Sequence, residues 1–389
     1  MPSHIARTFA RLFACSAAAF AAAASAGVEV NPDFPVYGQA VSVMLSDVGA
    51  DPYFIATRYR RDGANIVLEV EHASGGYFGY RPDTGYVPVS LGELAPGHYN
   101  VQAKLFDISD PDAAPLLFTR GIDVAPPESP GVYSVPRNPG ANEAFQLVVV
   151  ADGAIDASSL RATVTDSSIR VDFTYSTNGS APKFGNVKVP GLAPGAYAVE
   201  VFGKNPAFFV NPTRFSGSVG VDATTTVAEY YSPRLDHYFM SAWPDEMVAL
   251  DAGMGFMRTG ETFKAWLRQG DAPGYAVPVC RFYASGPNSH FYTADPGECQ
   301  FLKSLEAKQK AEANTKGQPF GGWQFEAIAF YALAPQGGTC PANTLPVYRA
   351  YNRRAEQGDS NHRFTVTSRM RVAMQVGWAD EGVAFCSPR

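Results

Sequence analysis

The fold of this chain is decided by a phrase that occurs three times: His237-Tyr238-Phe239, His290-Phe291-Tyr292 and His362-Arg363-Phe364. Each copy follows a tyrosine-containing strand signal and precedes a predicted helix. After that helix come a glycine–aromatic pair and a glutamate: Gly255-Phe256 with Glu261, Gly322-Trp323 with Glu326, and Gly377-Trp378 with Glu381. Elements that recur in the same order indicate an internal repeat. We therefore predict three copies of one unit between residues 227 and 389.

Each copy is expected to fold as strand, strand, short helix, strand. The second helix has the strongest start signal, with Asp295 as N-cap and Glu298 three residues later. It is expected to extend through Leu305, and the lysine-rich stretch 308–316 is interpreted as a solvated helix end and loop. The other two helices are expected at residues 244–250 and 368–376. Because one unit cannot bury its apolar face alone, three should close around a common core, which predicts a pseudo-threefold β-rich domain with one short helix per repeat.

Residues 27–125 and 130–222 are each expected to form a β-sandwich, because short apolar–polar alternations are bounded by Gly, Pro, Asp or Asn. The two regions share a phrase, Leu94-Ala95-Pro96-Gly97-His98-Tyr99-Asn100-Val101 and Leu192-Ala193-Pro194-Gly195-Ala196-Tyr197-Ala198-Val199. It resembles the L-x-P-G-x-Y-x-V entry to a late strand in bacterial immunoglobulin-like and fibronectin-like sandwiches. The predicted fold class is mainly β: two immunoglobulin-like sandwiches, forming a stalk, ahead of the repeat domain.

The first 26 residues have the pattern of a secretory signal peptide. Arg7 and Arg11 precede a short alanine-rich apolar run, and Ala24-Ser25-Ala26 is a small-x-small cleavage site. This predicts Gly27 as the mature N-terminus and a secreted, periplasmic or cell-surface protein. A rival interpretation takes the residues before Cys15 as a lipoprotein signal, but they leave no room for an apolar core. No later segment is apolar enough to predict a membrane span.

Four cysteines remain after the predicted cleavage, all in the repeat region: Cys280, Cys299, Cys340 and Cys386. In an exported chain an even number favours two disulfides over a zinc site. Of the three pairings that are formally open, we favour the two local ones, Cys280–Cys299 and Cys340–Cys386.

The repeat region resembles a bacterial repeat family of unknown function found at the C-terminal end of varied exported proteins. The resemblance covers residues 227–389 and rests on long phrases such as C-R-F-Y…S-H-F-Y-T-A-D-P-x-E-C and N-H-R-F-T…G-W-x-D-E-G-V-A-F-C. It implies an exported protein with a three-repeat module and no established catalytic role. The first copy departs from the pattern, with Met240 where the others have Thr293 and Thr365.

The repeat histidines and glutamates allow two interpretations. In the first, each histidine bonds a glutamate or a backbone carbonyl and fixes strand register. In the second, the three histidines converge on the pseudo-threefold axis and bind a metal, as three imidazoles can. Histidines flanked by aromatics belong to packed strands, which favours the structural role. The residues concerned are His237, His290, His362, Glu261, Glu326 and Glu381.

The aromatic residues offer a candidate ligand site, because exposed tyrosine and tryptophan rings stack on sugar rings. Most must still be core in so small a unit. The candidates for binding are Tyr231, Tyr283, Tyr351, Trp323 and Trp378.

No nucleophile elbow, H-E-x-x-H, P-loop or Rossmann glycine pattern occurs, so we expect no enzyme, no cofactor and no metal. The formal net charge of −6 and the absence of a cationic stripe exclude nucleic acid as the expected partner. The first hypothesis is a non-catalytic binding or adhesion protein whose repeat module recognises a cell-surface glycan or protein. The alternatives are a structural envelope component without a small ligand, and a hydrolase of cell-wall or extracellular polymers.

Overall fold

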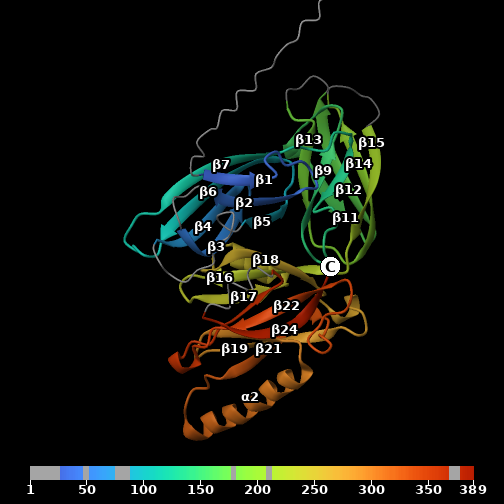
Figure 1. Ribbon diagram of the computed structural model, residues 1–389. Coiled ribbons are helices and arrows are strands. Elements are labelled where there is room, and N and C mark those ends of the chain that lie inside the picture. The colour runs from blue at the N-terminus through green and yellow to red at the C-terminus, as the bar shows by residue number, and fades with distance from the viewer. Residues whose placement is uncertain (1–26, 47–51, 75–87, 177–180, 207–212, 368–376) are drawn as a thin grey trace, which may run out of the picture.

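The computed structural model describes residues 27–46, 52–74, 88–176, 181–206, 213–367 and 377–389. Two predictions, the signal peptide at residues 1–26 and the third repeat helix at 368–376, fall outside these ranges. Within them the chain is mainly β, as predicted, and forms two sheet pairs and one three-part domain (Figure 1).

The first sheet pair buries one apolar core between a three-stranded and a four-stranded layer. The smaller layer has the order β1-β2-β5, with β1 at Gly27–Asn31, β2 at Ala40–Ser46 and β5 at Val89–Glu93. The larger has the order β3-β4-β6-β7, with β3 at Pro52–Asp62, β4 at Asn65–Ser74, β6 at Gly97–Asp107 and β7 at Leu116–Val124. Alternate residues of both layers, among them Val43, Leu68 and Val101, are buried in a single cluster.

The second sheet pair repeats this plan. One layer has the order β13-β9-β8, with β8 at Gly131–Val135, β9 at Phe145–Val150 and β13 at Phe184–Val189. The other contains β10 at Ala154–Ile155, β11 at Arg161–Val164, β12 at Ser168–Ser176, β14 at Gly195–Lys204 and β15 at Thr213–Val221. A 3₁₀ turn at Ala157–Ser159 joins β10 to β11. Strand by strand, β8, β9 and β13 correspond to β1, β2 and β5.

The shared Pro-Gly-x-Tyr phrase has the same structure in both copies. Gly97 and Gly195 have φ of +146° and +150°, a region that side-chain-bearing residues rarely adopt, and each begins a strand. The hydroxyl of Tyr99 donates to the carbonyl of Ala95 at 2.8 Å, and that of Tyr197 to Ala193 at 3.0 Å. A tyrosine bonded back to the backbone in this way is a feature of immunoglobulin-like sandwiches.

Both sheet pairs depart from an all-antiparallel plan in one pairing. β4 runs parallel to β6, and β12 runs parallel to β14. In each case the intervening strand, β5 or β13, lies in the other layer, so the chain crosses over and returns in the same direction. The immunoglobulin-like assignment stays a prediction.

The C-terminal domain contains three units: the first two have the predicted order of strand, strand, helix and strand, and the described part of the third has its three strands in the same order. The first has β16 at Thr225–Ser232, β17 at His237–Ser241, α1 at Pro244–Asp251 and β18 at Met257–Ala265. The second has β19 at Val277–Ala284, β20 at Ser289–Thr293, α2 at Pro296–Lys316 and β21 at Trp323–Ala332. The third has β22 at Thr344–Tyr351, β23 at His362–Thr365 and β24 at Ala379–Pro388. Short 3₁₀ turns lie at Gln269–Asp271 and Ala355–Gln357.

The three units share one core, with a phenylalanine from the last strand of each at its centre. The ring centroids are 5.8 Å apart for Phe263 and Phe330, 5.7 Å for Phe263 and Phe385, and 5.6 Å for Phe330 and Phe385. Their strand partners are equivalent valines, at positions 227, 279 and 347. The near-equal triangle marks the pseudo-threefold axis.

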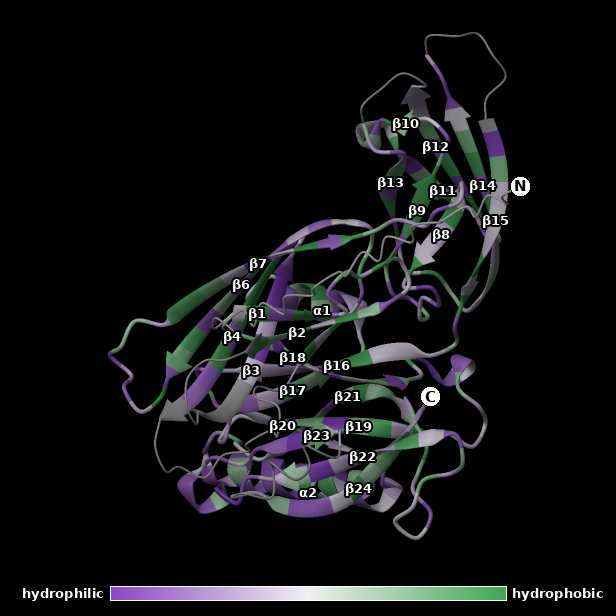
Figure 2. Ribbon diagram, turned by 45° about the horizontal axis from the view of Figure 1, so that its top comes forward, coloured by the Kyte–Doolittle hydropathy of each residue, from purple (hydrophilic) through white to green (hydrophobic). Residues whose placement is uncertain are grey.

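The helix α2 is longer than the sequence indicated. The stretch 308–316, interpreted above as partly a loop, continues the helix because Ala, Lys, Gln and Glu are good helix formers. Lys310 pairs with Glu306 one turn earlier at 2.7 Å, and Gly317 ends the helix with φ of +62°. In Figure 2 this outer helix is coloured largely as hydrophilic.

The stalk arrangement expected from the sequence is wrong. β18 of the first repeat pairs with β3 of the first sandwich through Arg258 and Tyr59, so that one seven-stranded sheet runs through both bodies. Figure 1 shows the repeat domain lying against the first sandwich, with the second sandwich to one side. The cause is tertiary: the edge of β3 accepts a strand that lies about two hundred residues further along the chain.

Candidate functional site

The strand register shows that the first repeat phrase is not aligned with the other two in the way their sequences suggest. Tyr283 and Tyr351 lie opposite His290 and His362, but Tyr231 lies opposite Tyr238. His237 instead lies opposite Ser232, one position earlier. The three histidines of the phrase are therefore not structurally equivalent.

The same offset removes the apparent irregularity at Met240. Ser241, not Met240, corresponds to Thr293 and Thr365. Each of these hydroxyl oxygens accepts a hydrogen bond from the backbone N–H two residues later, at 3.1, 3.0 and 2.9 Å respectively. At this position the first repeat follows the common pattern.

His237 connects the three repeats and does not contact the glutamate of its own repeat. Its ring is buried, with Nδ1 2.9 Å from the carbonyl oxygen of Asn288 and Nε2 2.7 Å from Oδ1 of Asp359. Asn361 makes the equivalent contact from the third repeat, donating to the carbonyl of Asp236 at 2.9 Å. Glu261 accepts hydrogen bonds from the hydroxyls of two threonines of the third repeat, at 365 and 367.

The contact between repeats one and two, which we call seam two, gathers rings and charges. His290 lies 5.0 Å from the Tyr283 ring and 4.7 Å from Phe239 of repeat one. The Arg281 guanidinium lies 5.2 Å from Phe239. Arg281 also donates to two carboxylates, Glu246 of repeat one at 3.0 Å and Glu326 of its own repeat at 2.9 Å.

The contact between repeats two and three, seam three, is built from the same groups. His362 lies 4.9 Å from Tyr351 and 4.8 Å from Phe291 of repeat two. Arg349 lies 4.9 Å from Phe291, 3.1 Å from a carboxylate oxygen of Glu298 and 2.7 Å from one of Glu381. Each arginine thus joins the helix of the preceding repeat to the last strand of its own repeat.

In the contact between repeats three and one, seam one, the acidic and basic residues stand at other positions than in seams two and three. Glu229 stands where the other seams have Arg281 and Arg349, and Arg363 stands where they have Phe239 and Phe291. Arg363 donates to both carboxylate oxygens of Glu229 at 3.1 Å, and its guanidinium lies 4.3 Å from the Tyr238 ring. This pair closes the ring of repeats.

The titratable groups of the seams have shifted pKa values with identifiable causes. Burial, assisted by the nearby Arg349 guanidinium, lowers the pKa of His362 to about 3, so that the ring is neutral at physiological pH. Burial alone would raise the pKa of Glu326, but the neighbouring His290 and Arg281 hold it below its usual value. Burial raises the pKa of Glu229 despite Arg363, its ion-pair partner.

The five aromatic residues predicted to bind a ligand are all half-buried. The hydroxyls of the three tyrosines have partners in the domain. Tyr231 donates to Asp236 at 3.0 Å, Tyr283 donates to Asn288 at 2.8 Å, and Tyr351 accepts from the Ala355 N–H at 3.2 Å. The two indoles also pack on rings, Trp323 at 5.8 Å from Phe291 and Trp378 at 6.1 Å from Tyr238. The tyrosines line the seams, one in each, and their role in binding stays a prediction.

The structure brings the histidines to no common metal site. His237 bonds Asp359 and Asn288, whereas His290 and His362 lie 3.4 and 3.6 Å from Glu326 and Glu381. Within the described ranges, no group of three or more His, Cys, Asp and Glu residues is arranged to hold a metal ion.

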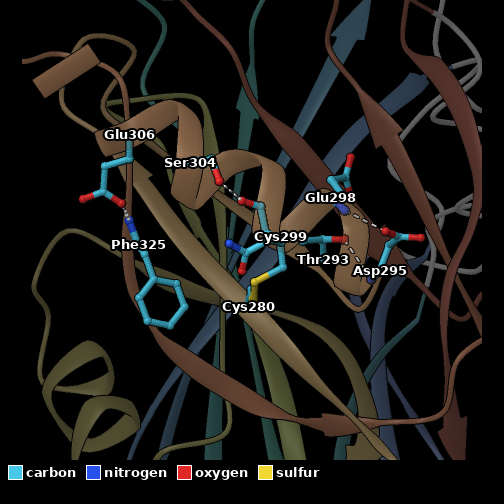
Figure 3. The surroundings of a disulfide bond; sticks show 9 residues. Cys280, Thr293, Asp295, Glu298, Cys299, Ser304, Glu306 and Phe325 are labelled. Atoms are coloured by element: carbon cyan, nitrogen blue, oxygen red, sulfur yellow. Dashed lines mark hydrogen bonds between the residues drawn. A yellow bond between two sulfur atoms is a disulfide. The ribbon is translucent and has the colours of Figure 1, made fainter. Parts of the chain in front are cut away.

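One disulfide lies within the second repeat and one within the third, and both are the local pairings that the sequence favours. Cys280 of β19 is bonded to Cys299 of α2, and Cys340 to Cys386 of β24. Figure 3 shows α2 held over β19 and β21: the Asp295 carboxylate caps Glu298 N–H, and the Glu306 carboxylate accepts from Phe325 N–H at 2.8 Å. Disulfides are typical of proteins that fold outside the reducing cytoplasm.

Sequence reasoning missed the charged members of the seams: Glu229, Glu246, Arg281, Glu298, Arg349 and Arg363. A signal was present, since C-R-F-Y and Y-R-A-Y place an arginine two residues before each tyrosine, and P-D-E and P-G-E place a glutamate at the start of two helices. Their partners lie in a neighbouring repeat, which no local pattern reveals.

Comparison with known proteins concerns the repeat domain alone. A family model described as a domain of unknown function (DUF5648) matches residues 225–388. No curated protein and no solved structure matches the chain. In the part of the chain that the structure describes, no helix has the length and apolar character needed to cross a bilayer.

Proposed function

We propose that this is an exported, non-catalytic binding protein whose repeat domain contacts a surface glycan or protein at seams two and three. The observation that carries the proposal is the duplication of one half-exposed group. Both seams present a tyrosine, a histidine, an arginine and two glutamates in the same mutual contacts.

The chemistry of the duplicated group suits recognition. A half-exposed ring next to carboxylates and a guanidinium offers an apolar face together with hydrogen-bond donors and acceptors. The four glutamate side chains keep 29–35% of their surface exposed, whereas Arg281 and Arg349 keep 12% and 16%. The carboxylates are thus the more accessible charges.

Seam one is unsuited to the same role. Its charged residues Glu229 and Arg363 are paired with each other, and the guanidinium of Arg58 from the first sandwich lies 5.0 Å from the Tyr231 ring. We therefore propose two equivalent ligand positions in a domain of three repeats.

The test is binding of the full mature chain to a panel of glycans, cell-wall polymers and surface proteins. The double variant Tyr283→Leu/Tyr351→Leu should lose at least tenfold in affinity for whatever the parent protein binds. Tyr275→Leu is the matched control, because Tyr275 is 74% exposed and lies outside the seams. Equal binding by the parent and the double variant would refute the proposal.

A second candidate, a structural envelope component, is favoured by a specific observation. All three seam tyrosines already use their hydroxyls in contacts within the domain. On that view the double variant would lower the melting temperature, and the parent protein would bind no member of the panel.

A further inference from the structure

We propose that seams two and three each accept an arginine side chain of a partner protein over the rings of Tyr283 and Tyr351. This inference rests on the proposed function, namely that these seams are ligand positions. It adds the chemical class of the ligand: a guanidinium group.

The first argument is a precedent within the chain. Arg58 comes from β3 of the first sandwich and places its guanidinium 5.0 Å from the ring of Tyr231. It is 4% exposed and pairs with Glu69 and Glu71 of its own sandwich. The first sandwich thus docks on the repeat domain by placing a cation over a seam tyrosine.

The second argument is that the three seam tyrosines share one ring contact, although their other neighbours differ. Each lies against a ring of the neighbouring strand, at 5.0 Å for Tyr231 and Tyr283 and 4.9 Å for Tyr351. Tyr231 and Tyr283 both donate to the side chain five residues later, Asp236 and Asn288. Over the described residues, a guanidinium lies on Tyr231 and none lies on Tyr283 or Tyr351.

The third argument is charge. Seam two contains the carboxylates of Glu246 and Glu326 around the single guanidinium of Arg281, and seam three repeats this ratio. Two carboxylates around one guanidinium leave an excess of acidic over basic side chains in each cluster, and the glutamates are more exposed than the arginine. A cation that approaches the tyrosine ring is attracted by both the ring and the carboxylates.

The chemistry of a ring and carboxylates in one seam favours arginine over lysine. A guanidinium stacks on an aromatic face and can at the same time donate two parallel hydrogen bonds to a carboxylate, whereas an ammonium acts as a point charge. A partner whose arginines are spaced to match the two seams would gain affinity from their linkage.

The experiment uses the full mature chain and a peptide labelled at its N-terminus, fluorescein-Gly-Arg-Gly-Arg-Gly-Arg-amide, in fluorescence anisotropy. The matching lysine peptide controls for bulk charge, which matters because the chain has a net charge of −6. We expect the arginine peptide to bind at least fivefold more tightly than the lysine peptide. Tyr283→Leu/Tyr351→Leu should lose this preference, while Tyr275→Leu should keep it.

Two further variants keep the test decisive if the leucine variant fails to fold. Tyr283→Phe/Tyr351→Phe retains the rings and should bind the arginine peptide within twofold of the parent. Glu326→Gln/Glu381→Gln retains the shape and should weaken binding at least threefold. Equal binding of both peptides, or equal loss in the Tyr275→Leu control, would overturn the proposal. Seam-dependent binding to the glycan panel without peptide binding would overturn this inference and leave the proposed function standing.

Discussion

Arg363 of the third repeat and Glu229 of the first form a two-pronged ion pair, with Nε–Oε1 and Nη2–Oε2 distances of 3.1 Å, across the seam that closes the ring of repeats. Glu229 is 2% exposed and also accepts from the Thr259 hydroxyl at 2.7 Å. The two residues are separated by 134 positions in the sequence.

Removal of one partner of this pair should be strongly destabilising. Glu229→Ala removes the carboxylate that accepts both hydrogen bonds of the buried Arg363 guanidinium, and loss of one partner of a buried ion pair costs about 3–5 kcal/mol of unfolding free energy. Urea denaturation of the mature chain measures the change. Glu229→Leu/Arg363→Met removes both charges and should recover at least half of the loss. A single variant within about 1 kcal/mol of the parent would show that the pair does not close the ring.

Acid should destabilise the repeat domain through His362. Its pKa of about 3 in the folded chain lies below the unfolded value of about 6.5, so the unfolded state binds more protons between these values. The unfolding free energy should therefore fall as pH decreases through this interval, by roughly 1.4 kcal/mol per pH unit from this residue. Denaturation midpoints between pH 4 and pH 7 measure the slope. His362→Phe should flatten it. His98→Gln should not flatten it, because the hydrogen bond to Asp123 raises the pKa of that exposed histidine and its contribution to the slope has the opposite sign.

The phenylalanine triangle should respond equally at its three corners. Phe263→Ala, Phe330→Ala and Phe385→Ala each open a cavity on the axis and should cost about 3–5 kcal/mol. The control is Phe301→Ala on α2, where the side chain is 63% exposed and the cost should stay below about 0.5 kcal/mol. A corner that costs no more than the control would contradict a core shared by three repeats.

The two disulfides should differ in their contribution to stability. Cys280 and Cys299 are 19 positions apart, whereas Cys340 and Cys386 are 46 apart. Chain-entropy arguments give about 3 kcal/mol for the shorter loop and about 4 kcal/mol for the longer one. Replacement of each pair by alanines, followed by urea denaturation, should show the larger loss for Cys340→Ala/Cys386→Ala. The reverse order would indicate that the attachment of α2, not loop entropy, dominates.

Much of the fold could be predicted because its signals are local. The capping residues Asp295 and Glu298 stand three positions apart, and the Pro-Gly turns before Tyr99 and Tyr197 fix their strands through a single bond to the backbone four residues earlier. The order of elements in each repeat follows from such short-range patterns. The sequence predicts too short a helix α2. The C-terminal half of this helix is mostly exposed, so no apolar pattern marks it, and helix propensity and the Glu306–Lys310 pair stabilise it.

By itself the sequence determined the mainly β class, the strand order common to the three repeats and the helices of the first two, and it favoured the two local cysteine pairings, since each depends on residues close together in the chain. Only the tertiary structure decided that Tyr238 takes the place of a histidine, that Glu229 meets Arg363, and that Arg58 of the first sandwich covers Tyr231. These relationships join positions more than a hundred residues apart or depend on a one-residue change of register. Packing around a shared core and the pairing of a distant strand edge select them, and neither leaves a periodic trace in the sequence.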